Sequence, residues 1–278
     1  MKPPFAYFGG KTISADRIAA LLPGHGHYVE PYCGSLAVLL AKPRSGMETV
    51  SDLDRALVTF WRVLRDRPAD LARQCALTPH SLAEFRDAED VDAPAGELEV
   101  ARRIWVRLTQ GRAGTLRNTG WRHFVHPSGS SYGMPDYLDG YVARMAAAAE
   151  RLHGVSLECR PALELVDWYG RSPDVLLYVD PPYLRSTRNS GAYRHEMTEA
   201  DHRDLAAALG RAGACVVLSG YASDLYDVEL YPGWHRAEFR SGTGQNAETW
   251  GNRTEVLWSN RPFRQGSLFD GLGEAATS

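Results

Sequence analysis

The sequence predicts an α/β fold in which a parallel-rich sheet is interrupted by a mostly helical lobe. Short apolar runs that suit buried strands, such as 175–179 (VLLYV) and 214–219 (ACVVLS), alternate with segments of helical periodicity. Residues 55–110 instead read as mostly helical. Strands and helices that alternate on both sides of a helical stretch are typical of an α/β sheet that carries an insertion.

The elements follow one another in a simple order. A glycine turn and a helix open the chain, and Pro23-Gly24 ends that helix. A short strand precedes the turn at 31–34, and a second short strand ends in the carboxylates Asp52 and Asp54. Further strands are expected in the sequences GVSLEC, VLLYV, ACVVLS and RTEVLWSN, and a helix capped by Thr198 is expected between the second and third of these.

The composition is that of an ordinary globular protein. The chain has 278 residues, 44% of them apolar, and no apolar stretch approaches the length of a membrane span. The N-terminal MKPPFAYFGGK lacks the apolar segment and cleavage site of a signal peptide, so we expect a cytoplasmic protein. The cysteines are dispersed without a CxxC pair, and the histidines lack Cys or acidic partners at ligand spacing. This argues against a disulfide framework and against a metal site.

The formal net charge of −3 conceals a local asymmetry. Residues 100–135 contain six arginines and no acidic residue, so this stretch carries +6 while the remainder carries −9. A basic segment in an otherwise acidic chain is the pattern expected for local contact with nucleic-acid phosphates. The alternative is a solvated helix face, although such a face usually carries interleaved acidic residues.

The run 175–185 (VLLYVDPPYLR) joins a buried strand to residues that suit a flat amine. Two prolines end the strand, so Asp180 stands at the carboxyl edge of the sheet, where open α/β sheets bind ligands. The Asp180 carboxylate and the carbonyl of Pro181 can both accept hydrogen bonds from one amino group, and Tyr183 offers a ring for stacking. Such acceptors draw a ring amine toward tetrahedral geometry and free its lone pair for attack on an electrophilic carbon. A surface Asp-Pro turn is the alternative interpretation.

Motifs in a fixed order give the chain a resemblance to a known family. They are Tyr7-Phe8-Gly9-Gly10-Lys11, Val29-Glu30-Pro31-Tyr32-Cys33-Gly34, Ser51-Asp52-Leu53-Asp54, the basic insertion and Asp180-Pro181-Pro182-Tyr183. Two later stretches match as well, Leu218-Ser219-Gly220-Tyr221 and Arg253-Thr254-Glu255-Val256-Leu257-Trp258. With these motifs the chain resembles the Dam-like family of DNA adenine N6-methyltransferases, over nearly its whole length. The resemblance implies a Rossmann-like methyltransferase sheet with an inserted, mostly helical DNA-recognition lobe. It also implies S-adenosyl-L-methionine as methyl donor and a double-stranded DNA substrate whose target base is flipped into the pocket. The catalytic residues that it implies are Asp180, Pro181, Pro182 and Tyr183.

The same resemblance, with the chemistry of the residue types, gives the candidate cofactor site. Lys11 suits a carboxylate of the cofactor or supports its loop, and Asp52 is placed to accept both ribose hydroxyls. Glu30 orients its loop, binds the cofactor amine or makes a structural hydrogen bond. We expect Gly34 to begin a helix whose N-terminus faces the cofactor carboxylate. The candidate cofactor-binding residues are Tyr7, Gly9, Gly10, Lys11, Glu30, Pro31, Tyr32, Gly34 and Asp52.

Two departures from the family pattern concern this cofactor site. Ser35 and Leu36 stand where a second Gly or Ala is common, which makes the loop tighter. An acidic residue that commonly contacts the cofactor adenine would fall near Arg160-Pro161, and this chain has none there. How the cofactor adenine is bound is therefore left open.

The candidate DNA contacts lie in the insertion. The stretch 114–118 (GTLRN) resembles the family segment that carries a G-x-x-R-x-N type pattern in a DNA-contacting hairpin. Arginine can read guanine and asparagine adenine in the major groove, but arginine also binds phosphates, and both uses stay open. Trp121 or Phe124 is a candidate for stacking or wedging, although burial is the commoner fate of such a ring. The candidate DNA-binding residues are Arg112, Arg117, Asn118 and Arg122.

The sequence therefore predicts a DNA (adenine-N6)-methyltransferase without a metal and without a membrane partner. Residues 1–60 and 150–262 are expected to form the catalytic domain, 61–149 the target-recognition insertion and 263–278 a flexible tail. The tail is similar, through Gln265, Leu268 and Phe269, to short peptides that bind the bacterial sliding clamp; a disordered tail is the alternative. Two alternative functions stay open, namely cytosine N4 methylation and a catalytically silent DNA-binding relative.

Overall fold

The computed structural model describes residues 1–123, 133–187, 193–241 and 253–264, and these contain one sheet of seven strands. The strands are β1 (His27–Glu30), β2 (Met47–Ser51), β3 (Ser156–Glu158), β4 (Val175–Val179), β5 (Cys215–Tyr221), β6 (His235–Ser241) and β7 (Arg253–Ser259). Their order is β3-β2-β1-β4-β5-β7-β6. Strands β1 to β5 are parallel to one another, whereas β7 is antiparallel to both β5 and β6. The first five strands have the order of a doubly wound nucleotide-binding fold, so the predicted Rossmann-like sheet is confirmed.

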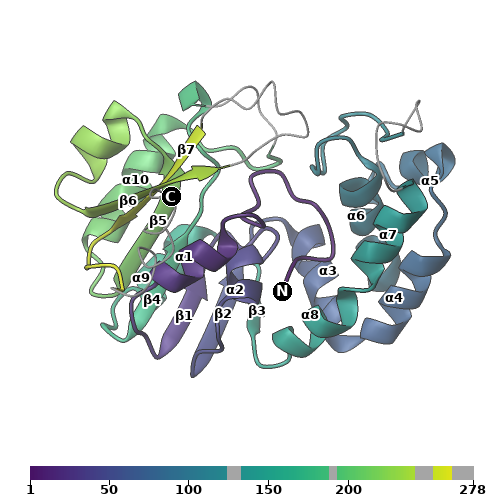
Figure 1. Cartoon of the computed structure of the whole chain (residues 1–278), viewed down its shortest axis with the longest axis horizontal. Coiled ribbons are helices and arrows are strands. Elements are labelled where there is room, and N and C mark those ends of the chain that lie inside the picture. Colours follow the sequence, from purple (N-terminus) through teal and green to yellow (C-terminus); the bar gives the residue numbers. More distant parts are fainter. Residues whose placement is uncertain (124–132, 188–192, 242–252, 265–278) are drawn as a thin grey trace, which may run out of the picture.

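Helices cover both faces of this sheet (Figure 1). The side chains of successive strand residues point to opposite faces. Tyr28 packs in the core that includes α1 and α2, whereas the next residue, Val29, packs in the core that includes α9 and α10. The bounds of these helices are α1 (Ala15–Leu21), α2 (Ala37–Ala41), α9 (Ala162–Tyr169) and α10 (Glu199–Gly210). The sheet is thus the middle layer of three, which accounts for the apolar run of β4, where all five residues are buried.

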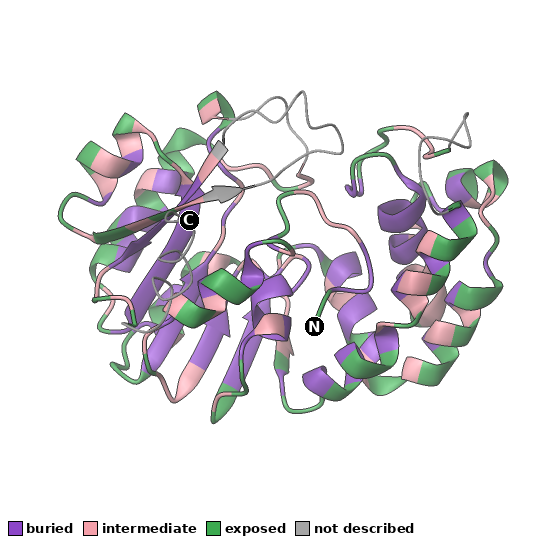
Figure 2. Ribbon diagram, viewed as in Figure 1, coloured by how far each residue is buried: buried purple, intermediate pink, exposed green. Residues whose placement is uncertain are grey.

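A second group of helices lies to one side of the sheet (Figure 1). Its members are α3 (Arg55–Asp66), α4 (Pro68–Leu77), α5 (Leu82–Asp87), α6 (Glu97–Gln110), α7 (Met134–Val142) and α8 (Met145–Leu152). Asp54 caps α3 by accepting from the amides of Ala56 at 3.0 Å and Leu57 at 3.3 Å. Buried residues alternate with exposed ones along these helices (Figure 2). One apolar core runs from Tyr28 in the sheet to Trp105 in α6, so this helical group is packed onto the sheet rather than tethered to it.

The sequence did not predict β6. This strand lies at the edge of the sheet, beyond β7, and its residues (HRAEFRS) are mostly polar. Only Ala237 and Phe239 of this edge strand are half-buried apolar residues, which is too short a pattern to give a periodicity signal. The remaining described elements are a 3₁₀ turn, η2 (Arg185–Thr187), and a π-helical segment, η3 (Leu225–Leu230).

The strand order reverses between β1 and β4, because β2 lies outside β1 and β5 lies outside β4. Loops leaving these two parallel strands run in opposite directions across the sheet and leave a crevice between them. Glu30 ends β1, and Asp180 follows the last residue of β4. The fold therefore brings the two sequence motifs to one place.

Candidate active site

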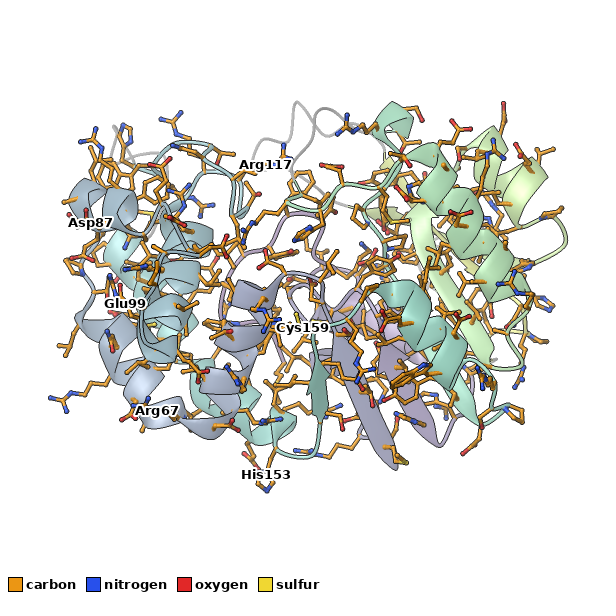
Figure 3. All side chains as sticks on the ribbon, turned by 180° about the vertical axis from the view of Figure 1, so that it is seen from behind. Arg67, Asp87, Glu99, Arg117, His153 and Cys159 are labelled. Atoms are coloured by element: carbon orange, nitrogen blue, oxygen red, sulfur yellow. The ribbon has the colours of Figure 1, made fainter. Side chains whose placement is uncertain are left out.

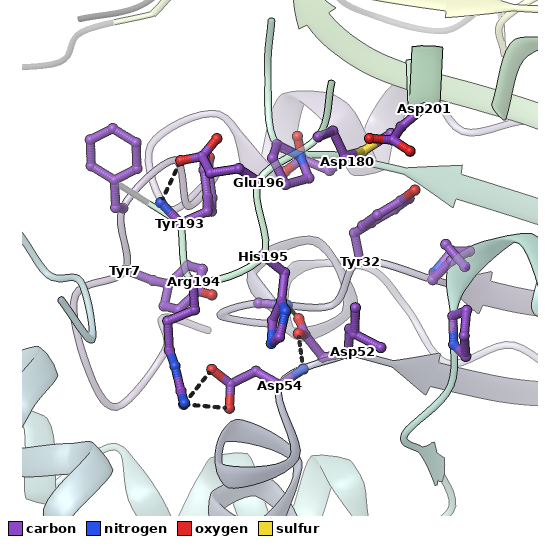
Figure 4. Close-up of a pocket in the computed structure, with 18 of the residues that line it drawn as sticks. Tyr7, Tyr32, Asp52, Asp54, Asp180, Tyr193, Arg194, His195, Glu196 and Asp201 are labelled. Carbon is purple, nitrogen blue, oxygen red and sulfur yellow. Dashed lines mark hydrogen bonds and ion pairs between the residues drawn. The ribbon is translucent and has the colours of Figure 1, made fainter. Parts of the chain in front are cut away.

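A cavity of about 300 Å³ opens at this switch point of the sheet (Figure 4). Its lining includes Pro31 after β1, Asp52 after β2 and Asp180 after β4. Of the candidate residues, it is lined by Tyr7, Pro31, Tyr32, Gly34, Asp52, Asp180 and Pro182. An adjoining space of about 30 Å³ is lined by Gly9, Gly10, Lys11, Glu30 and again Asp180. The structure thus brings most of the predicted cofactor and catalytic residues around one cavity, while Pro181 and Tyr183 are buried behind it.

The Asp180 carboxylate is paired with a buried lysine. Lys11 Nζ lies 2.8 Å from Asp180 Oδ1, and it also donates to the carbonyl oxygen of Gly9 at 2.9 Å. Burial raises the pKa of Asp180 to about 6, and the positive charge of Lys11 opposes that rise. Burial acts to lower the pKa of Lys11, but the charges of Asp180 and Glu255 outweigh it, so that pKa is raised. The pair is an ammonium beside a carboxylate at neutral pH, so Lys11 contacts residues 180–183, the predicted catalytic loop.

Tyr183 is held by its hydroxyl group. The hydroxyl donates to Glu255 Oε1 and lies 3.0 Å from Ser219 Oγ. The ring stands edge-on to that of Tyr221, with 4.7 Å between centroids, and Lys11 Nζ lies 4.7 Å from the Tyr183 centroid. Only 7% of Tyr183 is exposed, so its orientation is fixed by its neighbours and little of its ring is open for stacking in this structure.

Asp52 holds the loop that follows β1. Its Oδ2 accepts from the amide of Gly34 at 3.0 Å, and its Oδ1 accepts from the amide of Asp54 at 2.9 Å. Burial raises the pKa of Asp52 to about 6, and the hydrogen bonds from the two backbone amides oppose the rise. Each carboxylate oxygen of Asp52 accepts one hydrogen bond from a backbone amide and can accept another. Two vicinal hydroxyl groups are a fitting pair of further donors.

The expectation that Gly34 begins a helix is wrong. Helix α2 starts at Ala37, and Leu36 is its N-cap. Gly34 has φ +43° and Leu36 has φ +55°, so the turn passes twice through the left-handed region and delays the helix. A Cβ on Gly34 would also lie 3.0 Å from Cε1 of Tyr7. Gly34 therefore contributes to the site through its contact with Tyr7 and through the hydrogen bond from its backbone amide to Asp52.

Glu30 makes the structural hydrogen bond that was one of its predicted roles. The hydroxyl of Tyr28 donates to Glu30 Oε2 at 2.8 Å, and only 3% of Glu30 is exposed. Burial raises the pKa of Glu30 to about 8, although the Tyr28 hydrogen bond acts against the rise. Glu30 is therefore mostly protonated at neutral pH, as a neutral carboxyl group beside the cavity.

The glycines of the first motif are needed by the protein's own packing. Gly9 has φ +72°, and a Cβ there would lie 2.1 Å from the hydroxyl oxygen of Tyr193. A Cβ on Gly10 would lie 2.9 Å from Ser35 Oγ. These two candidate cofactor-binding glycines therefore make room for Tyr193 and for the Ser35 side chain.

Residues 193–197 are a part of the cavity wall that the sequence analysis missed (Figure 4). Arg194 Nη1 lies 3.1 and 3.2 Å from the two carboxylate oxygens of Asp54, and its Nη2 also binds Asp92. The ring of Tyr193 stands edge-on to Phe8, with 5.4 Å between centroids. No motif marks this segment, because its role depends on tertiary contacts with residues about 100 or more positions away.

A further wall is built by residues 160–163, where the family's acidic residue is missing. Pro161 and Leu163 line the cavity. The backbone amide of Arg160 donates a hydrogen bond to Ser51 Oγ at 3.1 Å, which fixes the start of this segment. The Arg160 guanidinium lies 4.3 Å from the ring centroid of Trp168. This wall offers apolar side chains and backbone in place of a carboxylate.

The candidate DNA-binding residues lie on a loop beside the cavity. Residues 111–122 turn back on themselves, with a bridge between Gly111 and Trp121. Arg112 and Arg117 are exposed, and Arg122 is half-buried with its Nη2 3.3 Å from the carbonyl oxygen of Arg112. Arg117 lies on the part of the helical group nearest the sheet, whereas Arg67 and Asp87 lie farther out (Figure 3). The loop reaches the cavity itself through residues 114–116.

Two polar and aromatic contacts qualify the predicted DNA surface. Asn118 is exposed, and its Nδ2 donates to Glu89 Oε1 at 2.7 Å, so a base would have to compete with that carboxylate. Trp121 stacks on His80 and on His123, with centroid distances of 4.4 and 5.3 Å. A ring that already stacks on two neighbours is a poor wedge, and Phe124, the other wedge candidate, lies outside the described residues.

The prediction of a basic surface over all of 100–135 is wrong for its helical half. Arg102 pairs with Glu84 and Glu99 at 2.6 and 2.7 Å, and Arg103 pairs with Glu99 at 3.1 Å. Arg107 is 1% exposed and packs 4.1 Å from the ring centroid of Phe85. The acidic partners precede residue 100 in the chain but lie against it in the fold, which a window along the sequence cannot reveal.

Other predictions concern metals, membranes and the tail. Within the described ranges, no group of three or more His, Cys, Asp or Glu side chains is arranged to hold a metal ion. No helix in that part of the chain combines the length and apolar character needed to cross a bilayer. Gln265, Leu268 and Phe269 lie outside the described residues, so the sliding-clamp peptide stays a prediction.

Comparison with protein families identifies the segment that carries the first three motifs. Residues 7–90 match the family described as D12 class N6 adenine-specific DNA methyltransferase. The similarity of this chain to the family is therefore found over residues 7–90. The match covers the candidate cofactor residues from Tyr7 to Asp52, whereas Asp180 lies beyond it. An enzyme of this class acts on DNA and uses a methyl donor, and the predicted resemblance is confirmed at this level.

Several solved structures are similar to this chain. One, described as putative methyltransferase yhhF from Escherichia coli, has 10% sequence identity and a TM-score of 0.33, and the match covers 86% of this chain and 78% of that one. A conserved hypothetical protein of Streptococcus pyogenes has 10% identity and a TM-score of 0.34, with coverage of 86% and 89%. A precorrin 8w decarboxylase of Methanobacterium thermoautotrophicum has 8% identity and a TM-score of 0.40, with coverage of 94% and 100%. A search of curated protein sequences found no match.

Proposed function

We propose that this D12 class methyltransferase transfers a methyl group from S-adenosyl-L-methionine to the N6 amine of an adenine flipped out of double-stranded DNA. The observation that carries the proposal is that Asp180 and Asp52 border one cavity. Asp180 offers acceptors for an amine, and Asp52 offers acceptors for two ribose hydroxyls. A nucleoside-bearing donor and an amine-bearing ring can therefore meet at this switch point.

The residues present suit the proposed donor. The cavity of about 300 Å³ is at the small end of the range for ligand pockets, roughly 300–1,000 Å³. Asp52 supports the ribose, and the apolar wall of Pro161 and Leu163 supports the adenine ring without the missing carboxylate. When bound, the donor supplies a methyl group on a positively charged sulfur, with a neutral thioether as leaving group.

The catalytic loop prepares the amine for attack. Asp180 is kept ionised beside Lys11, and it accepts a hydrogen bond from the N6 amine while the Pro181 carbonyl accepts another. The amine's lone pair leaves the ring system and forms the new N–C bond as the C–S bond breaks, with the bonding pair going to sulfur. The resulting cation is acidic and loses one proton to restore a neutral amine. The loop therefore contributes orientation and charge placement, and no strong base is required.

DNA is held, in this proposal, by the loop beside the cavity. Arg112, Arg117, Asn118 and Arg122 belong to the loop whose residues 114–116 line the cavity, and Arg and Asn side chains bind phosphates and base edges. On this basis residues 61–149 form the target-recognition insertion, and residues 1–60 and 150–262 form the catalytic domain. Flipping the base costs a few kcal/mol, which contacts from both parts would offset.

The test is methyl transfer from radiolabelled S-adenosyl-L-methionine to mixed-sequence duplex DNA, with DNA binding measured on the same protein. Label on deoxyadenosine supports the proposal. Label on deoxycytidine instead indicates cytosine N4 methylation, and tight DNA binding without transfer indicates a catalytically silent relative. Either of these two outcomes would overturn the proposed reaction.

A further inference from the structure

A buried glutamate on β7, Glu255, contacts the last residue of the proposed catalytic loop, Tyr183. Glu255 is paired with Tyr221 in the antiparallel register of β5 and β7, and only 3% of it is exposed. Ser219 lies two residues before Tyr221 on β5, so its side chain is on the same face of the sheet as those of Tyr221 and Glu255. The three residues that follow Glu255, Val256 to Trp258, are apolar and buried, and a buried charge is costly unless it is paired.

One oxygen of the Glu255 carboxylate contacts two hydroxyl groups and an ammonium group. Glu255 Oε1 accepts from the hydroxyl of Tyr183 and from Ser219 Oγ at 2.8 Å, and it lies 3.5 Å from Lys11 Nζ. The same ammonium is 2.8 Å from Asp180 Oδ1. The buried Glu255 and the partly buried Asp180 therefore share one lysine, with Asp180 as the closer partner.

This sharing links the tyrosine and the aspartate of the catalytic loop. Because a hydrogen-bonded hydroxyl and an edge-on neighbour fix the Tyr183 ring, the loop is held at its last residue. Because Glu255 takes part of the charge of Lys11, Asp180 is less fully neutralised and stays a stronger acceptor. Removing Glu255 would leave Lys11 to Asp180 alone.

We propose that Glu255 is a positioning residue of the methyl-transfer reaction, which anchors Tyr183 through its hydroxyl and tunes Asp180 through their common partner Lys11. The proposal rests on the proposed function and adds a residue that lies outside both the catalytic loop and the matched family segment. Glu255 is not among the residues that line the cavity or the adjoining space, so it acts through Lys11, Tyr183 and Ser219, which its Oε1 contacts.

The decisive variant is Glu255→Gln, which keeps the shape of the side chain and removes its charge. Loss of accurate loop position and acceptor strength is expected to lower kcat by about tenfold to 100-fold, with KM for DNA and for S-adenosyl-L-methionine little changed. Glu238→Gln, on the neighbouring strand β6 and exposed, is the matched control and should behave as wild type.

The pH profile separates this role from a merely structural one. Burial is the main cause of the raised pKa of Asp180, the charge of Glu255 adds to it, and Lys11 opposes it. The acid limb of kcat should therefore move to lower pH in Glu255→Gln and stay near its wild-type position in Glu255→Asp. The ionisable groups whose charges act on or respond to Asp180 are Lys11, Glu30, Tyr178, Tyr183, Tyr226 and Glu255.

Two further variants keep the test decisive if Glu255→Gln does not fold. Tyr183→Phe and Ser219→Ala each remove one donor to the Glu255 carboxylate and leave its charge in place. Each is expected to lower kcat, and unchanged kcat in both would overturn the anchoring role. An unmoved acid limb in a folded Glu255→Gln protein would overturn the tuning role. Wild-type methylation of adenine in the same assay tests the proposed function separately, because it does not depend on the variants.

Discussion

Lys11 Nζ lies 2.8 Å from Oδ1 of Asp180. Lys11, the last residue of the glycine-rich motif near the N-terminus, therefore contacts the proposed catalytic loop after β4. The side chains are 6% and 16% exposed, which makes the pair largely buried. Removing one member of a buried pair leaves the other uncompensated. The two motifs therefore act as one unit, and the following predictions depend on that unit and on the surfaces around it.

Asp180→Asn should abolish most of the activity while leaving substrate binding intact. The amide keeps the shape of the side chain but loses the charge that makes it a strong acceptor for the amine. We expect kcat to fall by about 10²–10³, as for loss of a key charge-stabilising group. Single-turnover methylation, with DNA binding measured in parallel, checks this. Asp167→Asn, on the exposed side of α9, is the control, and a variant of Asp180 with near wild-type kcat would contradict the proposed mechanism.

The activity should fall as the pH drops through about 6. Burial raises the pKa of Asp180 from 3.8 to about 6, so the carboxylate becomes protonated below this pH and stops accepting from the amine. Asp52 has a pKa raised to about 6 for the same main reason, so the donor's KM should rise over the same range. A kcat and KM profile from pH 5 to 9 measures both effects. A flat profile down to pH 5 would refute the assignment.

Glu30 should make the fold less stable at high pH. Burial raises its pKa from 4.5 to about 8, so the folded state binds a proton that the unfolded state has already released. The stabilising contribution is complete below pH 4.5 and is lost as the pH rises through about 8. Glu30→Gln removes this loss, and its Tm should decline less than that of wild type between pH 6 and 9. Glu164→Gln, exposed on α9, should keep the wild-type decline; an identical decline in Glu30→Gln would count against a buried neutral carboxyl.

Arg117→Ala should weaken DNA binding and reduce its dependence on salt. If the exposed guanidinium contacts a phosphate, losing it removes about one unit from the slope of log K against log salt. Arg73→Ala is the matched control, because Arg73 is exposed on α4 of the same helical group. Binding titrations at several salt concentrations check the pair. Equal slopes for Arg117→Ala and wild type would remove Arg117 from the DNA surface.

The sheet and the position of the catalytic loop could be predicted from the sequence, because buried parallel strands leave continuous apolar runs and prolines mark their ends. The edge strand β6 left no such pattern. Asp52 was predicted at the end of a strand, and it directly follows β2. The partners of Lys11 and the cavity wall around Arg194 could not be predicted, because they depend on residues that only the fold brings together. The same limit explains the basic segment, since Glu84 and Glu99 neutralise Arg102 from outside it.

The measurement that tests the central claim most directly is mass spectrometry of nucleosides from duplex DNA treated with the purified protein and S-adenosyl-L-methionine carrying a deuterated methyl group. The account predicts N6-methyldeoxyadenosine that carries the deuterated methyl, formed by wild type and reduced to near background by Asp180→Asn. Deuterated methyl on deoxycytidine, or equal yields of methyladenine from wild type and Asp180→Asn, would contradict it.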